Sequence, residues 1–219
     1  MPGSDLGGAS GTISWIVPTA RSAPRKDTMT DLGDTHREIG RRPIAAGDAR
    51  TIVMRRWYGA SIGEVWHCCT DPERVARWFM RPEGDLRVGG RFVFEGSAGG
   101  EVRRCEPPRL LTVSLVYGSR PADEVELRLA PNGGGTVLEL EHASVTTHIE
   151  VGGRMVDVLL NDPNSGLWGL GAGWEMGLVA LDALLRNALP ERATRRGATG
   201  AVSLADQSSQ AWAELLAAG

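Results

Sequence analysis

His142 is the side chain in this sequence that is best placed to do chemistry. Its position follows the alternation of Leu138 and Leu140, so we expect its imidazole to point to the apolar side of a strand. A histidine buried there needs a hydrogen-bonding partner. It could bind the polar end of a ligand, act as acid or base in a cyclase- or hydrolase-like enzyme, or bond a backbone carbonyl or water. The last, purely structural role is favoured.

Ser61 is a second candidate, because residues 59–63 match the Gly-x-Ser-x-Gly pattern of a nucleophilic serine. That nucleophile belongs to a parallel α/β sheet, however, and Glu64 follows the serine at the spacing of a helix capping box. Glu101 and Arg104 are only remote partners for an enzymatic histidine. We therefore assign no catalytic residue, and a binding role is favoured over catalysis.

Neither a metal nor a cofactor is expected. Residues 67–69, His-Cys-Cys, are consecutive on a predicted helix and point about 100° apart, so they cannot converge on one ion. His142 and His148 lack the cysteine or carboxylate spacing of a zinc site. The glycines at 133–135 lack the lysine and hydroxyl residue of a phosphate-binding loop, and are typical of a hairpin turn.

The elements that must position His142 can be predicted from the pattern of apolar residues. The β-rich run at 51–58 predicts a first strand, and Ser61 and Asp71 are N-cap residues for two short helices, the second with Pro72 at its first position. From residue 85 to 140 alternate positions are apolar and short turns intervene, which indicates antiparallel strands with one dry face.

A long helix is predicted near the C-terminus of this region. Trp174, Leu178, Leu181 and Leu185 are spaced i, i+4, i+7 and i+11, which places them on one helical face. The dry face of the sheet is the only apolar surface of comparable length. We therefore predict an α+β fold in which a curved antiparallel sheet wraps around the long C-terminal helix, with two short helices after the first strand.

Composition is that of a soluble globular protein. The 219 residues are 42% hydrophobic and 23% charged, with a net charge of -3, and arginines are interleaved with acids, which argues against nucleic-acid binding. No apolar run is long enough to span a membrane and no basic segment precedes an early one, so membrane insertion and secretion are not expected. The adjacent pair Cys68 and Cys69, with Cys105 alone, indicates a reducing cytoplasm.

Three regions are predicted along the chain. Residues 1–48 lack sustained periodicity and are predicted to be a disordered leader, within which Met29 is an alternative translation start. Residues 49–189 form the folded domain. Residues 190–219 are a tail with a short helix near 208–217, and docking of its Trp212 and Leu216 is favoured over fraying.

The stretches that carry a family resemblance are SIGEVWHCCTDPERVARWFM, GDLRVGGRF, EVRRCEPPRLLTVSL, TVLELEHASV and GAGWEMGLVALDALL. Their order and spacing resemble the SRPBCC superfamily, also called START-like or helix-grip, and within it the branch named after the activator of the heat-shock protein 90 ATPase. The resemblance covers about two thirds of the chain. It implies a sheet gripping the long helix around a cavity that in many relatives accepts an apolar ligand. The superfamily does not share one reaction, so the fold implies binding and no chemistry.

The resemblance and the strand parity together predict a ligand-binding lining. It comprises Trp66, Trp78, Phe92, Phe94, Leu115, His142, Trp174, Leu178 and Leu181. Each of these residues could instead be ordinary core packing. An apolar small molecule is the expected partner, a protein partner of co-chaperone or regulatory type is the alternative, and a loop near Asn164 is a candidate gate.

Overall fold

The computed structural model describes residues 32, 35–162, 164, 168–187 and 199–219, and within the last range it describes side chains from residue 204 onward. The alternative start at Met29 and most of the loop around Asn164 therefore lie outside the described residues. Four helices and ten strands are assigned in the described part. They are β1 (His36–Ile44), β2 (Gly47–Tyr58), α1 (Ile62–Thr70), α2 (Pro72–Trp78), β3 (Pro82–Gly84), β4 (Arg91–Phe94), β5 (Gly99–Glu106), β6 (Leu110–Val116), β7 (Asp123–Asn132), β8 (Gly135–Ser144), β9 (His148–Val151), β10 (Arg154–Asp157), α3 (Leu170–Leu185) and α4 (Thr199–Ala218).

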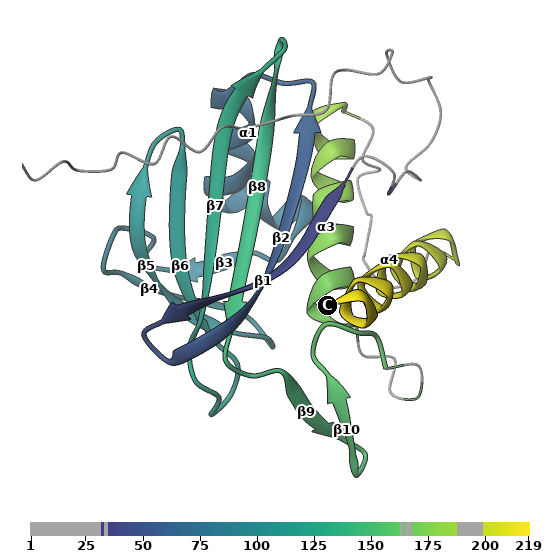
Figure 1. Cartoon of the computed structure of the whole chain (residues 1–219). Coiled ribbons are helices and arrows are strands. Elements are labelled where there is room, and N and C mark those ends of the chain that lie inside the picture. Colours follow the sequence, from purple (N-terminus) through teal and green to yellow (C-terminus); the bar gives the residue numbers. More distant parts are fainter. Residues whose placement is uncertain (1–31, 33–34, 163, 165–167, 188–198) are drawn as a thin grey trace, which may run out of the picture.

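Eight strands form one antiparallel sheet in the order β1-β2-β8-β7-β6-β5-β4-β3, and β9 pairs with β10 in a separate hairpin. Figure 1 shows α3 running along the concave side of the curved sheet, α4 crossing outside α3, and the β9–β10 hairpin projecting below. This arrangement confirms the predicted α+β fold, a curved antiparallel sheet wrapped around a long C-terminal helix.

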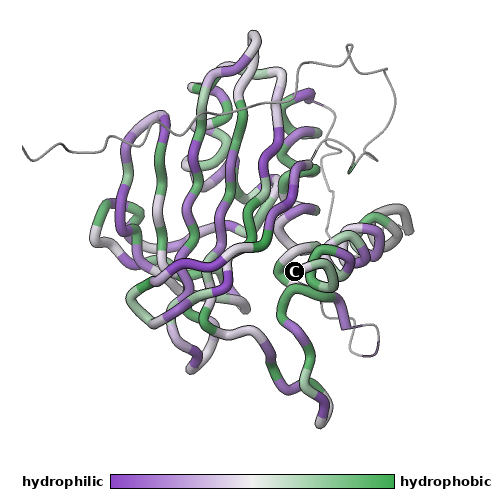
Figure 2. Tube along the Cα trace, viewed as in Figure 1, coloured by the Kyte–Doolittle hydropathy of each residue, from purple (hydrophilic) through white to green (hydrophobic). Residues whose placement is uncertain are grey.

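The two faces of the sheet follow the predicted alternation. Leu127 lies opposite Leu140 and Leu129 opposite Leu138, and all four leucines are buried. On the other face Glu139 binds the guanidinium of Arg128, with 2.7 Å between Oε1 and Nη1. Figure 2 shows this alternation of hydrophilic and hydrophobic residues along the strands. Period-two patterning therefore decides which side of the sheet receives α3.

The short helices begin where their capping residues predict. The Oγ of Ser61 accepts a hydrogen bond of 3.3 Å from the backbone N–H of Glu64, and Oδ1 of Asp71 accepts one of 3.0 Å from Arg74. Pro72 takes the first position of α2. These caps satisfy backbone donors that the first helical turn leaves unpaired. The prediction placed both helices after the first strand, whereas in the structure they follow the second strand, because β1 precedes the strand predicted to be the first.

The prediction of a disordered leader up to residue 48 is wrong for residues 36–48. His36–Ile44 form the edge strand β1, which pairs along its whole length with β2. No residue of β1 is fully buried, so its hydropathy gives little indication of order. The strand is held by backbone pairing and by ion pairs such as Arg42 with Glu141, and polar side chains of this kind are typical of an edge strand.

The predicted C-terminal helix is present but longer than residues 208–217. α4 spans Thr199–Ala218, and Trp212 is fully buried, which confirms that the helix docks. The indole ring of Trp212 lies over Gly171 in α3, where a Cβ atom would come within 2.5 Å of the ring. Short side chains dominate the helix, so its sequence alone shows a weak apolar stripe. None of the described helices is long and apolar enough to cross a membrane.

Candidate functional site

His142 lies on β8 and is completely enclosed between the sheet and α3. Its Nε2 is 2.9 Å from Oδ2 of Asp123 on β7, and its Nδ1 accepts a hydrogen bond of 2.8 Å from the indole Nε1 of Trp174 on α3. The side chains of the histidine and the aspartate are 0% and 6% exposed. Strand parity predicted the inward direction of His142 correctly. The expected partner was a backbone carbonyl or a water, whereas the structure pairs the imidazole with two side chains, Asp123 and Trp174.

The two hydrogen bonds define the tautomer of His142. An indole N–H can only donate, so Nδ1 of the histidine must be the unprotonated acceptor. The proton of a neutral imidazole then resides on Nε2 and is donated to the carboxylate of Asp123. Both ring nitrogens are engaged, and neither faces a space where a substrate could exchange a proton with it.

Asp123 is the buried partner of His142 that sequence reasoning missed. Val125, Leu127 and Leu129 on the same strand are buried on the dry face, and Asp123 lies two residues before Val125 on the same parity. Val125 is paired with His142 across the ladder, which places the carboxylate diagonally beside the imidazole. Extending the alternation of β7 by one step toward its N-terminus would have found it.

A small cavity adjoins Asp123 where the sheet meets the start of α3. Its volume is about 30 Å³, which is room for about two water molecules. The lining residues are Tyr117, Arg120, Asp123, Ser144, Thr146, Val158 and Leu170. The Oδ1 atom of Asp123 is buried and has no hydrogen-bonding partner among the described residues. Asp123 therefore brings to the cavity a carboxylate with one unsatisfied oxygen, and such an oxygen is a place where a donor can bind.

Tyr117 and Arg120 supply further polar groups to this cavity. Burial, together with the nearby charge of Asp123, raises the pKa of the Tyr117 phenol to about 12, so the hydroxyl is neutral and able to donate. The guanidinium of Arg120 lies 5.1 Å from the centre of the Tyr117 ring, and its Nε donates to the Tyr117 carbonyl. Ser144, by contrast, is engaged with the backbone of Thr146.

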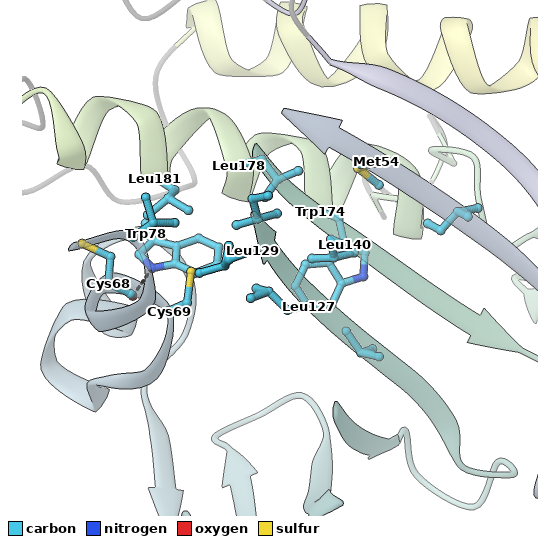
Figure 3. Close-up of a cluster of buried hydrophobic side chains, with 14 of the residues drawn as sticks. Met54, Cys68, Cys69, Trp78, Leu127, Leu129, Leu140, Trp174, Leu178 and Leu181 are labelled. Carbon is cyan, nitrogen blue, oxygen red and sulfur yellow. Dashed lines mark hydrogen bonds between the residues drawn. The ribbon is translucent and has the colours of Figure 1, made fainter. Parts of the chain in front are cut away.

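Eight of the nine residues predicted to line a ligand cavity belong to one apolar cluster, and His142 contacts that cluster through Trp174. Trp78, Phe92, Leu115, His142, Trp174, Leu178 and Leu181 are buried, and Trp66 and Phe94 are half-buried at its margin. Figure 3 shows several of them filling the space between α3 and the sheet. Fully buried side chains such as Leu178 and Leu181 leave no water-sized space against them.

Aromatic stacking closes the middle of this cluster. The ring of Phe79 lies parallel to Trp174 at 4.9 Å between centroids and meets Phe94 edge-on at 5.2 Å. Phe92 contacts Phe94 at 5.3 Å, and the indole of Trp78 donates to the Cys68 carbonyl at 2.8 Å. Phe79, the C-cap residue of α2, was not among the predicted lining residues and is central to the stack.

The other residues considered for catalysis do not converge on His142. Ser61 caps α1, Glu101 pairs with Arg103, and Arg104 pairs with Glu106. Within the described chain, neither Ser61, Glu101 nor Arg104 forms a hydrogen bond with the histidine.

The His-Cys-Cys segment of α1 also points in different directions. His67 is exposed, whereas Cys68 and Cys69 are buried, and burial raises the pKa of both thiols. Within the described residues, no group of three or more His, Cys, Asp or Glu side chains is arranged to hold a metal ion.

Comparison with known proteins gives one family and one set of well-matched structures. Residues 59–185 match the family described as activator of Hsp90 ATPase homolog 1-like protein. The crystal structure of CalU16 from Micromonospora echinospora is 40% identical, with a TM-score of 0.65, over 84% of this chain and 98% of that one. Its solution NMR structure is 42% identical, with a TM-score of 0.67, over 84% and 96%. No curated protein matches the chain.

Proposed function

This chain belongs to the family of activator of Hsp90 ATPase homologue 1-like proteins, and from that premise we propose that it binds an apolar small molecule between the sheet and α3. The site lies where the cavity beside Asp123 meets the apolar cluster around Trp174. Ligand sites in proteins are mostly apolar with a few placed polar groups, and this region has that composition.

The observation that carries the proposal is the buried carboxylate of Asp123 next to a cavity. Removing a carboxylate from water costs several kcal/mol unless its oxygens are hydrogen-bonded. Here Oδ2 is bonded to His142, while Oδ1 lacks a partner among the described residues. A core that served stability alone would be at least as stable with apolar residues in place of both Asp123 and His142, so the buried pair supports a recognition role.

The size of the cavity sets how a ligand enters. A volume of about 30 Å³ accepts a hydroxyl-sized group, whereas pockets for whole drug-sized ligands measure about 300–1,000 Å³. The apolar body of the ligand must therefore displace side chains. Val158 and Leu170 line the cavity, and Leu170 starts α3, whose first turn has no side-chain cap. We infer that the start of α3 moves to admit the ligand.

The geometry gives less support to catalysis or to a protein partner. His142 has both nitrogens engaged, which leaves no general base open to a substrate. Four large apolar residues are the most exposed ones described. Trp57 lies in β2, Met155 in β10, Val93 in β4, and Val88 in the turn before β4. They come from three parts of the fold, and single exposed apolar residues are ordinary.

Fluorescence titration with N-phenyl-1-naphthylamine, a neutral dye that brightens in apolar sites, tests the proposal. We expect saturable binding, weakened about tenfold or more by Leu170→Trp, because Leu170 lines the cavity and a larger side chain there takes up its volume. Val93→Trp is the matched control, because Val93 is half-exposed on β4 and should leave the affinity unchanged. Absence of saturable binding, or equal effects of the two variants, contradicts the proposal.

A further inference from the structure

We propose that the cavity beside Asp123 recognises a hydroxyl group on an otherwise apolar ligand. The inference rests on the proposed function and names the ligand's polar chemistry. Asp123 lines the cavity and is nine-tenths buried, its Oδ2 is engaged by His142, and its buried Oδ1 has no hydrogen-bonding partner in the described part of the chain. A carboxylate accepts hydrogen bonds and does not donate them, so the complementary ligand group must donate.

The hydrogen bond from His142 fixes the position of the aspartate. Nε2 of His142 donates to Oδ2, and Trp174 holds the imidazole from the opposite side. The carboxylate therefore cannot rotate to place its free oxygen elsewhere without breaking a buried hydrogen bond. His142 thus acts as a positioning residue for Asp123, which accounts for a buried histidine that has no nitrogen left for a ligand.

The charges around the cavity favour a neutral donor over a cation. Arg120 lines the same cavity as Asp123, so its guanidinium offsets the attraction of the carboxylate for an ammonium group. A hydroxyl has one donor and two acceptor sites. It can donate to Asp123 and accept from the neutral phenol of Tyr117 or from Arg120, whereas an ammonium can only donate. The lining therefore offers an acceptor for the hydroxyl proton and donors for the hydroxyl oxygen.

The volume agrees with this assignment. A hydroxyl oxygen is about the size of a water molecule, so a cavity of about 30 Å³ accepts the hydroxyl together with about one further water-sized group. The apolar walls formed by Val158 and Leu170 then meet the carbon atoms next to the hydroxyl. The ligand class is accordingly a hydrophobic alcohol or phenol, bound hydroxyl first.

Competition against bound N-phenyl-1-naphthylamine tests the inference with four probes that share one skeleton. They are 2-phenylethanol, 2-phenylethylamine, the methyl ether of 2-phenylethanol, and propylbenzene. In the wild-type protein we expect the alcohol to displace the dye at a concentration about tenfold lower than the ether or propylbenzene, because only the alcohol and the amine can donate to Asp123. The amine should be weaker than the alcohol.

Asp123→Asn is the informative variant. Its amide carbonyl can still accept from His142, while an NH₂ donor replaces the free acceptor, so the advantage of the alcohol over the ether should be lost or reversed. Asp48→Asn, at the exposed start of β2, is the matched control and should keep the wild-type order. If Asp123→Asn fails to fold, the comparison of alcohol with ether in the wild-type protein still decides the question.

The possible outcomes separate the two proposals. Equal displacement by all four probes overturns the hydroxyl site and leaves the apolar binding proposal standing. Strongest displacement by the amine overturns the assignment of a neutral donor. Failure of the dye to bind at all contradicts the proposed function itself. Only preference for the alcohol, lost in Asp123→Asn and kept in Asp48→Asn, supports the hydroxyl site.

Discussion

The indole Nε1 of Trp174 donates a hydrogen bond of 2.8 Å to Nδ1 of His142, which joins the long helix to the centre of the sheet through two buried side chains. Through the other imidazole nitrogen this link continues to Asp123. One chain of hydrogen bonds therefore runs from α3 across β8 to the wall of the cavity.

Replacing Trp174 with phenylalanine should cost about 2–5 kcal/mol of unfolding free energy, because it removes buried atoms and leaves Nδ1 of His142 without a donor. Urea denaturation measures this. Trp57→Phe is the control, since Trp57 is 45% exposed and its loss should cost about 1 kcal/mol or less. A double-mutant cycle with His142→Leu should show coupling of about 0.5–3 kcal/mol. Strict additivity would mean that the hydrogen bond has no energetic role.

Glu175 should hold two peripheral elements on α3. Its fully buried carboxylate accepts from Arg37 of β1, with 2.9 Å from Nε to Oε2, and from Ser208 of α4, with 2.6 Å from Oγ to Oε2. Glu175→Ala leaves the guanidinium without its carboxylate, at a cost of about 3–5 kcal/mol. We expect faster hydrogen exchange in both β1 and α4.

The matched control for this clamp is Glu214→Ala on the exposed side of α4, which should change hydrogen exchange little. Unchanged exchange in α4 of the Glu175 variant would show that Trp212 alone anchors the helix.

Gly171 and Gly173 in α3 should respond oppositely to alanine. A Cβ at Gly171 would meet the Trp212 ring at 2.5 Å, so Gly171→Ala should cost about 1–3 kcal/mol by overpacking. Gly173 has nothing within 4 Å of its would-be Cβ, so Gly173→Ala should stabilise the helix by up to about 1 kcal/mol. Thermal melting of the pair measures the difference, and equal effects would contradict the described contact between α3 and α4.

The two tyrosines should titrate abnormally in the folded protein. Burial raises the pKa of Tyr117 to about 12 and that of Tyr58 well above 10, and the Tyr58 hydroxyl donates to the Leu178 carbonyl at 3.1 Å. Ultraviolet absorbance should therefore show little phenolate at pH 10.

These tyrosine pKa shifts also set the sign of the pH dependence of stability. The folded state holds tyrosine protons that the unfolded state releases near pH 10. The contribution of a buried tyrosine to the free energy of unfolding is therefore fully present below pH 10 and is lost as pH rises toward 12. Each tyrosine should steepen the loss by up to about 1.4 kcal/mol per pH unit. Tyr117→Phe should flatten the dependence, and an unchanged slope would contradict its burial.

The sheet and α3 could be predicted from sequence because their apolar residues keep one period. Leu138, Leu140 and His142 on β8, and Trp174, Leu178 and Leu181 on α3, all face inward as their spacing requires. Such patterns report burial on one side of an element, and that burial decides both the register of the strands and the face of the helix.

What the sequence did not reveal depends on partners that are distant along the chain. β1 is ordered by pairing with β2 and by ion pairs, which hydropathy does not detect. Asp123 was overlooked because a carboxylate at the start of a strand is usually solvated, and its burial follows from His142, nineteen residues later. The closure of the aromatic stack by Phe79 likewise requires the three-dimensional placement of α2 beside α3.

Binding of an apolar molecule beside Asp123 is tested most directly by NMR of the indole N–H signals, assigned by tryptophan-to-phenylalanine variants, during titration with 2-phenylethanol. We expect the Trp174 signal to shift saturably, because its N–H reports through His142 on Asp123, while the signal of the exposed Trp57, whose N–H donates to the Asn132 carbonyl, stays in place. A static Trp174 signal, or shifts confined to the exposed Trp57, would contradict it.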